Sequence, residues 1–157
     1  MVDVKKITFE NVPKPRRFPG YCNSNDTFYM FGGIIDKTST YVNHLWSLNL
    51  ITMKWNNLNP IGECIPLERF GCSLNYYDRK LYLFGGFNRI KLTTNDLWIF
   101  DLLGNIWVQI NSLETDIKPP HSQYHRTVIY KSYMILFGGI NYIESKRAWF
   151  CYNDVYV

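Results

Sequence analysis

Histidines and acidic residues are the side chains through which this chain could bind a metal or catalyse a reaction. His121 and His125 are four residues apart, a spacing that brings two imidazoles to one metal ion on a helix. The surrounding stretch, PPHSQYHR, starts with prolines and leads into an alternating segment, which predicts a strand instead. On a strand the two residues would lie about 13 Å apart, at roughly 3.3 Å per residue, which is too far for one ion. We therefore predict no metal site and no cofactor.

The remaining polar candidates favour structural roles. Asp96, Asp101 and Asp154 stand at turns or at equivalent positions of the repeat described below, which is typical of scaffold residues. We expect His44 to form a hydrogen bond at the end of a strand and His125 to be structural. The sequence shows no nucleophile beside a base, and it predicts that the chain is not an enzyme.

Cysteine usage and charge narrow the class of protein. The four cysteines form no C-x-x-C pair, which predicts free thiols in a reducing compartment. A net charge of +4 with both signs mixed disfavours a nucleic-acid partner. No run of 18 uncharged apolar residues or secretory leader is present, so we expect no membrane partner and a cytoplasmic location, with the nucleus as the alternative.

A repeat organises the chain. Three pairs of adjacent glycines, Gly32-Gly33, Gly85-Gly86 and Gly138-Gly139, each follow a short apolar run and lie 53 residues apart. A period of this size indicates supersecondary units stacked or arranged in a circle. The aromatic share of 17% predicts that these units bury many rings.

Other residues recur in step with the glycines. Asn43, Asn95 and Asn153 each begin an alternating stretch, and Trp55 and Trp107 follow the first two by twelve residues. Upstream of the glycine pairs by 16 residues stand Arg16, Arg69 and Ser122. Each unit therefore predicts four short antiparallel strands, with the second strand apolar on both faces because neighbouring units cover both sides of it.

The glycine pairs predict a special backbone at the end of the second strand. Glycine adopts conformations closed to other residues and lets a bulky group approach the main chain. We expect that group to be a large ring of the same unit, and Trp55 and Trp107 are the rings at the right position.

These residues resemble the kelch repeat, whose signature is an apolar run, Gly-Gly, an Asn-Asp-like strand start with an aromatic residue, and a later Trp. The resemblance covers essentially the whole chain, in about three repeats. It departs from the pattern at Ser122 in place of Arg, at Pro19 and Cys72 in place of His, and in a longer insert between Gly139 and Asn153. It implies an all-β fold, a segment of a β-propeller with four-stranded antiparallel blades, and a role as a platform for other proteins.

Three blades amount to half of a six-bladed propeller. We predict one domain over residues 1–157, with a lone fourth strand at 6–12, blades at 16–58 and 69–110, and a third blade at 122–157 that lacks its fourth strand. In kelch proteins a terminal strand often completes a blade, so strand 6–12 is expected to complete the third blade of its own chain or of a partner chain. One hypothesis is a homodimer that closes a six-bladed ring; the other is that the sequence is a piece of a longer kelch protein.

The loops between second and third strands, at 34–42, 87–94 and 140–152, are where we expect a partner to bind. Loop residues are not committed to packing, and aromatic and basic residues anchor protein interfaces. Five basic residues face two acidic ones there, which favours a partner protein or acidic peptide. The predicted binding residues are Lys37, Tyr41, Phe87, Arg89, Lys91, Tyr142, Lys146, Arg147 and Trp149. The alternative function is that of a metal-dependent propeller enzyme of the oxidase, epimerase or specifier-protein type.

Overall fold

The computed structural model describes residue 9 and residues 11–111 and 118–157. Within these ranges the regular structure is β, apart from one turn of 3-10 helix, η1 (Glu144–Lys146), which confirms the all-β prediction. Among the same residues no helix has the length and apolar character needed to cross a membrane.

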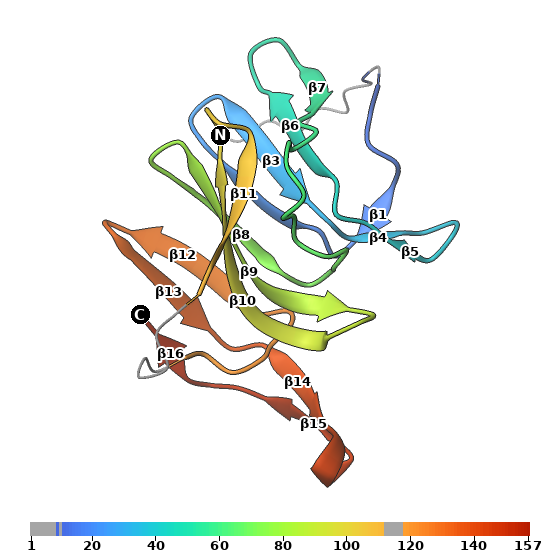
Figure 1. Cartoon of the computed structure of the whole chain (residues 1–157), viewed down its shortest axis with the longest axis vertical. Helices are drawn as coiled ribbons and strands as arrows, with labels where there is room; N and C mark the ends of the chain where they lie inside the picture. The colour runs from blue at the N-terminus through green and yellow to red at the C-terminus, as the bar shows by residue number, and fades with distance from the viewer. Residues whose placement is uncertain (1–8, 10, 112–117) are drawn as a thin grey trace, which may run out of the picture.

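Two four-stranded antiparallel sheets form the centre of the molecule (Figure 1). The first sheet contains, in spatial order, β2 (Gly20–Asn23), β3 (Thr27–Phe31), β6 (Leu45–Asn49) and β7 (Lys54–Asn57). The second sheet contains β8 (Ser73–Tyr77), β9 (Lys80–Asn88), β10 (Leu92–Asp101) and β11 (Ile106–Ile110). In both sheets the order in space follows the order in the chain, as expected for a repeated meander.

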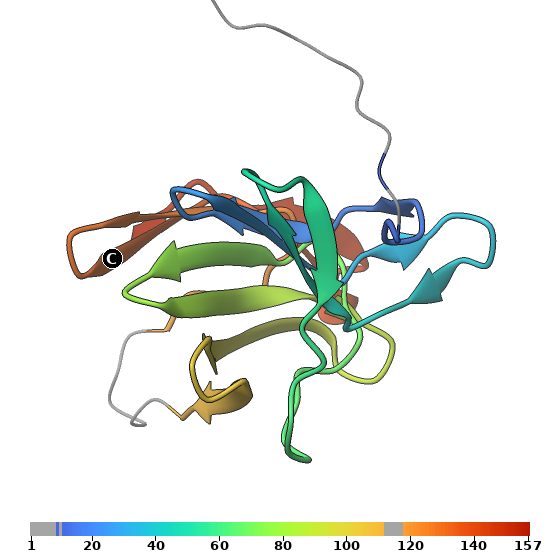
Figure 2. The same ribbon diagram turned by 90° about the horizontal axis from the view of Figure 1, so that it is seen from above.

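A third sheet follows the same plan with three strands. It contains β12 (Arg126–Tyr130), β13 (Tyr133–Phe137) and β16 (Val155–Tyr156), and β16 has no further neighbour among the described residues. The predicted strand at 6–12 falls largely outside the described part of the chain. Figure 2 shows the three sheets from above.

The connections between second and third strands, predicted as loops, contain additional β-hairpins. The first comprises β4 (Ile34–Ile35) and β5 (Thr40–Tyr41), with β1 (Arg16–Arg17) paired to β4; the second is the extension of β9 and β10 beyond Gly86; the third comprises β14 (Ile140–Ile143) and β15 (Ala148–Cys151). We call these the rim hairpins, because Figure 1 shows that all three project to the same side of the sheets. Backbone pairing makes this side more rigid than free loops would be.

The hydrophobic core lies between the first and second sheets. Tyr29 and Phe31 of β3 pack against residues of the second sheet, including Leu81 and Leu83 of β9, both of which are fully buried. The middle strand β9 of the second sheet is buried on both faces because the first and third sheets cover it from either side. The second sheet, flanked by the other two, is therefore the most protected part of the molecule.

The expectation that a tryptophan ring of the same unit lies on each glycine pair is wrong. All six glycines have positive φ, between 60° and 98°, so their special backbone is real. However, a side chain at Gly32 would meet the backbone oxygen of Arg69, and one at Gly85 would meet that of Ser122. Gly32 and Gly85 thus admit the main chain of the next unit, which joins neighbouring sheets, whereas Gly33 and Gly86 admit the backbone oxygens of Arg17 and Phe70 in their own units.

The tryptophans fill the space between sheets instead. Trp107 on β11 is buried, with its ring centroid 5.4 Å from that of Phe31 in the first sheet. Trp55, at the equivalent position on β7, is half-buried and packs only on its own sheet, against Trp46 and Phe28. The difference arises because no described residue from another sheet covers that face of the first sheet.

Candidate functional site

The rim hairpins carry all nine residues predicted to bind a partner. On the first hairpin Lys37 lies in the turn and Tyr41 on β5. The second and third hairpins carry the others: Phe87 on β9, Arg89 and Lys91 in the adjoining turn, Tyr142 on β14, Lys146 in η1, and Arg147 and Trp149 at and just after its end. Three sequence-distant segments are thus brought to one side of the molecule, and two pockets lie among them.

The first pocket, of about 280 Å³, lies between the first and second rim hairpins. The guanidinium of Arg89 lies 4.6 Å from the ring centroid of Tyr41 and donates a hydrogen bond to the carbonyl of Ser39 at 3.0 Å. These contacts hold an exposed basic group in place at the pocket wall. The lining consists of Thr38, Thr40, Tyr41, Leu67, Glu68, Asn88, Arg89 and Ile90.

The second pocket, of about 330 Å³, lies between the second and third rim hairpins. Tyr142 and Trp149 form an aromatic wall, with ring centroids 5.4 Å apart, and Lys91 contributes a basic group. The other lining residues are Phe87, Leu92, Thr93, His121 and Asn141. One aromatic wall with one cation is a suitable environment for a side chain that is partly apolar and partly acidic.

A single turn, residues 88–91, separates the two pockets and is fixed by a buried amide. Asn88 is 1% exposed, and its Oδ1 accepts hydrogen bonds from the backbone N–H groups of Ile90 and Lys91. Its Nδ2 is buried and has no hydrogen-bond partner among the described residues. The sequence analysis did not single out Asn88, although an Asn before a basic turn is a common signal for such a structure.

Aromatic residues support the rim from below. The ring of Phe70 lies between those of Tyr41 and Phe87, with centroid distances of 5.1 and 5.3 Å, and it also contacts Phe18 and Tyr124. This cluster joins residues near the start of each sheet to the first two rim hairpins. The sequence analysis missed Phe70 because it lies outside the loops that it considered.

Three of the predicted binding residues line neither pocket. Lys37 is exposed in its turn, and Arg147 adopts a left-handed conformation (φ 46°) after η1. Lys146 lies over the ring of Phe150, with Nζ 4.5 Å from its centroid. These three residues add positive charge around the pockets, while Asp36, an acidic residue of the first hairpin, is paired with Arg17 at 2.6 Å.

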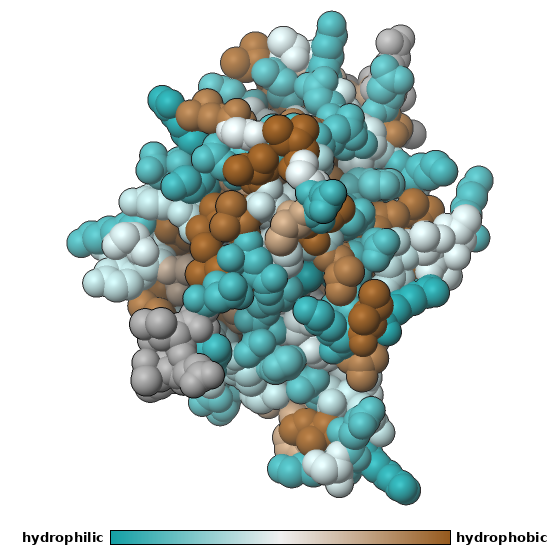
Figure 3. Space-filling model, in the orientation of Figure 1, coloured by the Kyte–Doolittle hydropathy of each residue, from teal (hydrophilic) through white to brown (hydrophobic). Residues whose placement is uncertain are grey.

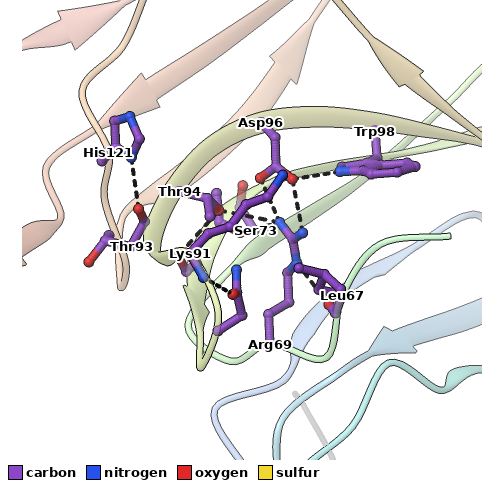
Figure 4. Close-up of polar contacts among 12 residues, drawn as sticks. Leu67, Arg69, Ser73, Lys91, Thr93, Thr94, Asp96, Trp98 and His121 are labelled. Carbon is purple, nitrogen blue, oxygen red and sulfur yellow. Dashed lines mark hydrogen bonds and ion pairs between the residues drawn. The ribbon is translucent and has the colours of Figure 1, made fainter.

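A buried ion pair anchors the second rim hairpin to its sheet (Figure 4). Arg69 donates to both carboxylate oxygens of Asp96, at 2.7 and 2.9 Å, and Trp98 Nε1 donates to Asp96 Oδ2 at 2.7 Å. Burial would raise the pKa of Asp96, but the hydrogen bonds and charge of Arg69, with that of the indole, hold it at about 2. The carboxylate therefore remains ionised and satisfies two buried donors at once.

His125 and His121 have separate environments. His125 is buried between the second and third sheets, with Nε2 3.0 Å from Ser73 Oγ and Nδ1 3.1 Å from Ser122 Oγ, and burial lowers its pKa to about 4. His121 Nδ1 lies 2.7 Å from the carbonyl oxygen of Thr93. His44, expected to bond at a strand end, makes no side-chain hydrogen bond among the described residues, whereas its backbone carbonyl accepts from Gly32 N–H.

Few of the described side chains are suited to metal binding or thiol chemistry. Among the described residues no three His, Cys, Asp or Glu side chains are placed to hold one metal ion. All four cysteines are free thiols, as predicted. Burial raises the pKa of Cys22 to about 12 and that of Cys72 to about 11, so both remain protonated at neutral pH.

The exposed surface carries no broad apolar region on the side seen in Figure 1. Figure 3 shows hydrophobic residues there in separate small groups among hydrophilic ones. A partner that binds this face must therefore combine apolar with polar contacts.

Comparison with known proteins agrees with this architecture. Residues 4–157 match the family model described as the KLHDC2/KLHL20/DRC7 Kelch-repeats domain. Kelch domain-containing protein 2 of Bos taurus is 31% identical over 134 residues, which is 85% of this chain and 32% of that protein. Host cell factor homolog hcf-1 of Caenorhabditis elegans is 28% identical over 160 residues, covering 89% of this chain and 20% of that protein.

A third relative, Kelch domain-containing protein 1 of Mus musculus, is 32% identical over 102 residues, or 64% of this chain and 25% of that protein. The chain thus spans about a third or less of the length of these relatives. The family model, in contrast, matches nearly every residue. The protein belongs to the kelch-repeat family.

Proposed function

We propose that this kelch-repeat chain is a non-catalytic binding platform and that it holds an acidic peptide segment of a partner protein on the rim hairpins. The observation that carries this proposal is the pair of pockets on either side of one turn. Arg89 lines one pocket beside Tyr41, with Glu68 as the acidic residue of that lining, and Lys91 lines the other beside the aromatic wall of Tyr142 and Trp149. Kelch-repeat relatives are typical interaction modules, which supports a general role of this chain in binding other proteins.

The shape of the rim suits an extended peptide. A peptide that crosses the 88–91 turn can direct alternate side chains into the two pockets, because side chains of an extended chain at positions two apart point the same way. The buried Asn88 and the cation–π contact of Arg89 keep the turn in one conformation, so little ordering is needed on binding. Positive charge from Lys37, Lys146 and Arg147 attracts an acidic segment toward this side.

A charge reversal tests the rim. The substitutions Arg89→Glu and Lys91→Glu in one protein are expected to abolish binding of a fluorescent peptide of alternating Glu and Leu, measured by fluorescence anisotropy. The matched control is Lys54→Glu with Lys131→Glu, which changes the net charge equally at the opposite ends of the strands, since Lys54 begins β7 and Lys131 lies in the turn between β12 and β13. If both double variants lose affinity equally, binding is a net-charge effect and the rim is not the site.

We further propose that two copies of the chain close a six-bladed ring. The supporting observation is the pair of uncovered sheet faces. Phe137 of the third sheet is 55% exposed, whereas its counterpart Phe31 is buried beneath Trp107; Trp55, the counterpart of Trp107, is half-buried. Seating Trp55 of one copy on Phe137 of another repeats a contact already present in the molecule.

Sedimentation equilibrium tests the paired ring. The proposal predicts a species of twice 18.6 kDa, and Trp55→Lys is expected to shift it to monomer. A folded monomer at micromolar concentration would contradict the paired ring and leave the rim proposal standing.

A further inference from the structure

The Arg69–Asp96–Trp98 network of the second sheet has an incomplete counterpart in the first sheet. Repeat alignment places Arg16 opposite Arg69, Trp46 opposite Trp98, and His44 opposite Asp96. The sequence analysis assigned this histidine only a hydrogen bond at the end of a strand. The structure shows which hydrogen-bond donors lack a carboxylate partner when histidine stands in the place of aspartate.

The two arginines are held in the same way. Arg69 donates from Nε to the carbonyl of Leu67 at 3.1 Å and from Nη1 to that of Gly85 at 3.0 Å. Arg16 donates from Nε to the carbonyl of Lys14 and from Nη1 to that of Gly32, both at 3.1 Å. Since two backbone oxygens fix each guanidinium, the free edge of Arg16 presents donors as Arg69 presents them to Asp96.

The indole N–H of Trp46 is also left without an acceptor. Trp98 Nε1 donates to Asp96, whereas Trp46 Nε1 is buried and has no partner in the described part of the chain. A buried donor without an acceptor costs free energy, and a bound acceptor recovers it. Two groups that one carboxylate satisfies in the second sheet therefore have no carboxylate acceptor among the described residues of the first.

In the described part of the chain, Arg16 has no acidic side chain beside it. Among the described residues no carboxylate lies within 4 Å of Arg16, whose pKa is lowered by burial. Burial, with the charges of Arg16 and Lys14, also lowers the pKa of His44, so the imidazole remains neutral at physiological pH. The local field is positive, and it favours an anion.

We propose that Arg16 and Trp46, bordered by Lys14 and His44, form a carboxylate-binding notch that takes an aspartate or glutamate side chain of a partner protein. The planar guanidinium fork matches two oxygens of a carboxylate, and the molecule's own example of this geometry holds a carboxylate. The inference rests on the proposed function for the identity of the partner, and it gives the acidic segment a specific contact beyond the rim pockets.

The notch stays reachable even in a fully flanked sheet. The second sheet has neighbours on both sides, yet the side chain of Asp96 remains 14% exposed while that of Arg69 is 1% exposed. The carboxylate position therefore reaches solvent in the second sheet, and His44, at the equivalent position of the first sheet, is exposed.

Titration with propionate tests the notch without any partner. We expect the indole ¹H–¹⁵N resonance of Trp46, assigned with Trp46→Phe, to shift and saturate as propionate is added. His44→Asp supplies an internal carboxylate and is expected to weaken propionate binding at least tenfold while raising the melting temperature, so that misfolding cannot explain the loss. His44→Asn, of the same shape but uncharged, is the matched control and is expected to bind propionate as the wild type does.

Three results would overturn the inference. They are an unmoved Trp46 resonance, equal affinity of wild type and His44→Asp, and an equal response to inorganic phosphate, which would indicate charge without carboxylate geometry. A peptide of alternating Glu and Leu should bind at least tenfold more tightly than propionate; equal affinity would exclude a protein side chain as the natural ligand. The rim variant Arg89→Glu/Lys91→Glu should bind propionate normally, so failure at the rim and failure at the notch are distinguishable.

Discussion

The first and second sheets have the same strand order, and each has an arginine that donates to backbone oxygens at equivalent positions of the repeat. Among the described residues, only the arginine of the second sheet has a carboxylate partner. Asp96 joins Arg69 and Trp98 in one network, whereas His44 leaves Arg16 and the Trp46 N–H without an acidic partner. Under the proposed notch, equivalent positions of this repeat protein divide between structure and binding. The second sheet completes its polar network internally, and the proposal assigns the unpaired donors of the first sheet to a ligand.

The largest expected effect comes from removing the carboxylate of the second sheet. Asp96→Asn leaves the guanidinium of Arg69, 1% exposed, without a counter-charge, and this is expected to lower the free energy of unfolding by about 3–5 kcal/mol. His44→Asn at the equivalent exposed position should change it by less than about 0.5 kcal/mol. Urea unfolding measures both, and similar losses in the two variants would contradict the difference between the sheets.

The pH dependence of stability distinguishes the two junctions between sheets. His125 lies at the second junction, between the second and third sheets. Cys72 has the equivalent position at the first junction, between the first and second sheets. Burial lowers the pKa of His125 from 6.5 to about 4, so the unfolded chain binds a proton at higher pH than the folded protein does. Stability is then fully present above pH 6.5 and falls as the pH drops toward 4, by about 3 kcal/mol.

Asp96, with a pKa of about 2, loses its contribution only as the pH falls below 3.8, so the two windows are separate. His125→Cys makes the second junction resemble the first and should remove most of the slope between pH 6.5 and 4, leaving the part due to His44, whose pKa is also lowered by burial. Persistence of the full slope in that variant would show that another group causes it.

Glycine substitutions compare a covered pair with an uncovered one. A Cβ at Gly85 would lie 2.9 Å from the carbonyl oxygen of Ser122, whereas at Gly138 the nearest atom is 3.6 Å away. Both glycines have positive φ, so alanine is strained at each. Gly138→Ala is expected to cost about 1 kcal/mol and Gly85→Ala about 3 kcal/mol, because a contact with fixed backbone is added. Equal changes in melting temperature would mean that φ alone explains the glycine pairs.

The repeat and its strands could be predicted from the sequence because periodicity and glycine spacing are local patterns. The sequence also placed the nine residues predicted to bind a partner on one side, and the structure gathers Tyr41 with Arg89, and Lys91 with Tyr142 and Trp149, around two pockets. What lies against the glycines could not be predicted, since the contact joins residues of different units. The rim hairpins were missed because strands as short as β4 and β5 leave little periodic signal.

The notch illustrates a different limit. Aligning the repeats reveals His44 in the place of Asp96, but sequence alone does not show that Arg16 keeps the orientation of Arg69. Only the two backbone hydrogen bonds of each arginine establish that equivalence. A substitution in a repeat thus becomes informative when the surrounding geometry is shown to be conserved between units of the same molecule.

A double-mutant cycle between residues 16 and 44 tests most directly whether the first sheet is a copy of the second that lacks only its carboxylate. His44→Asp is expected to raise the free energy of unfolding by about 1 kcal/mol when Arg16 is present, through new hydrogen bonds to a charged group, and to give no gain when Arg16 is replaced by Gln. The same change in stability in both backgrounds, or none in either, would contradict the account.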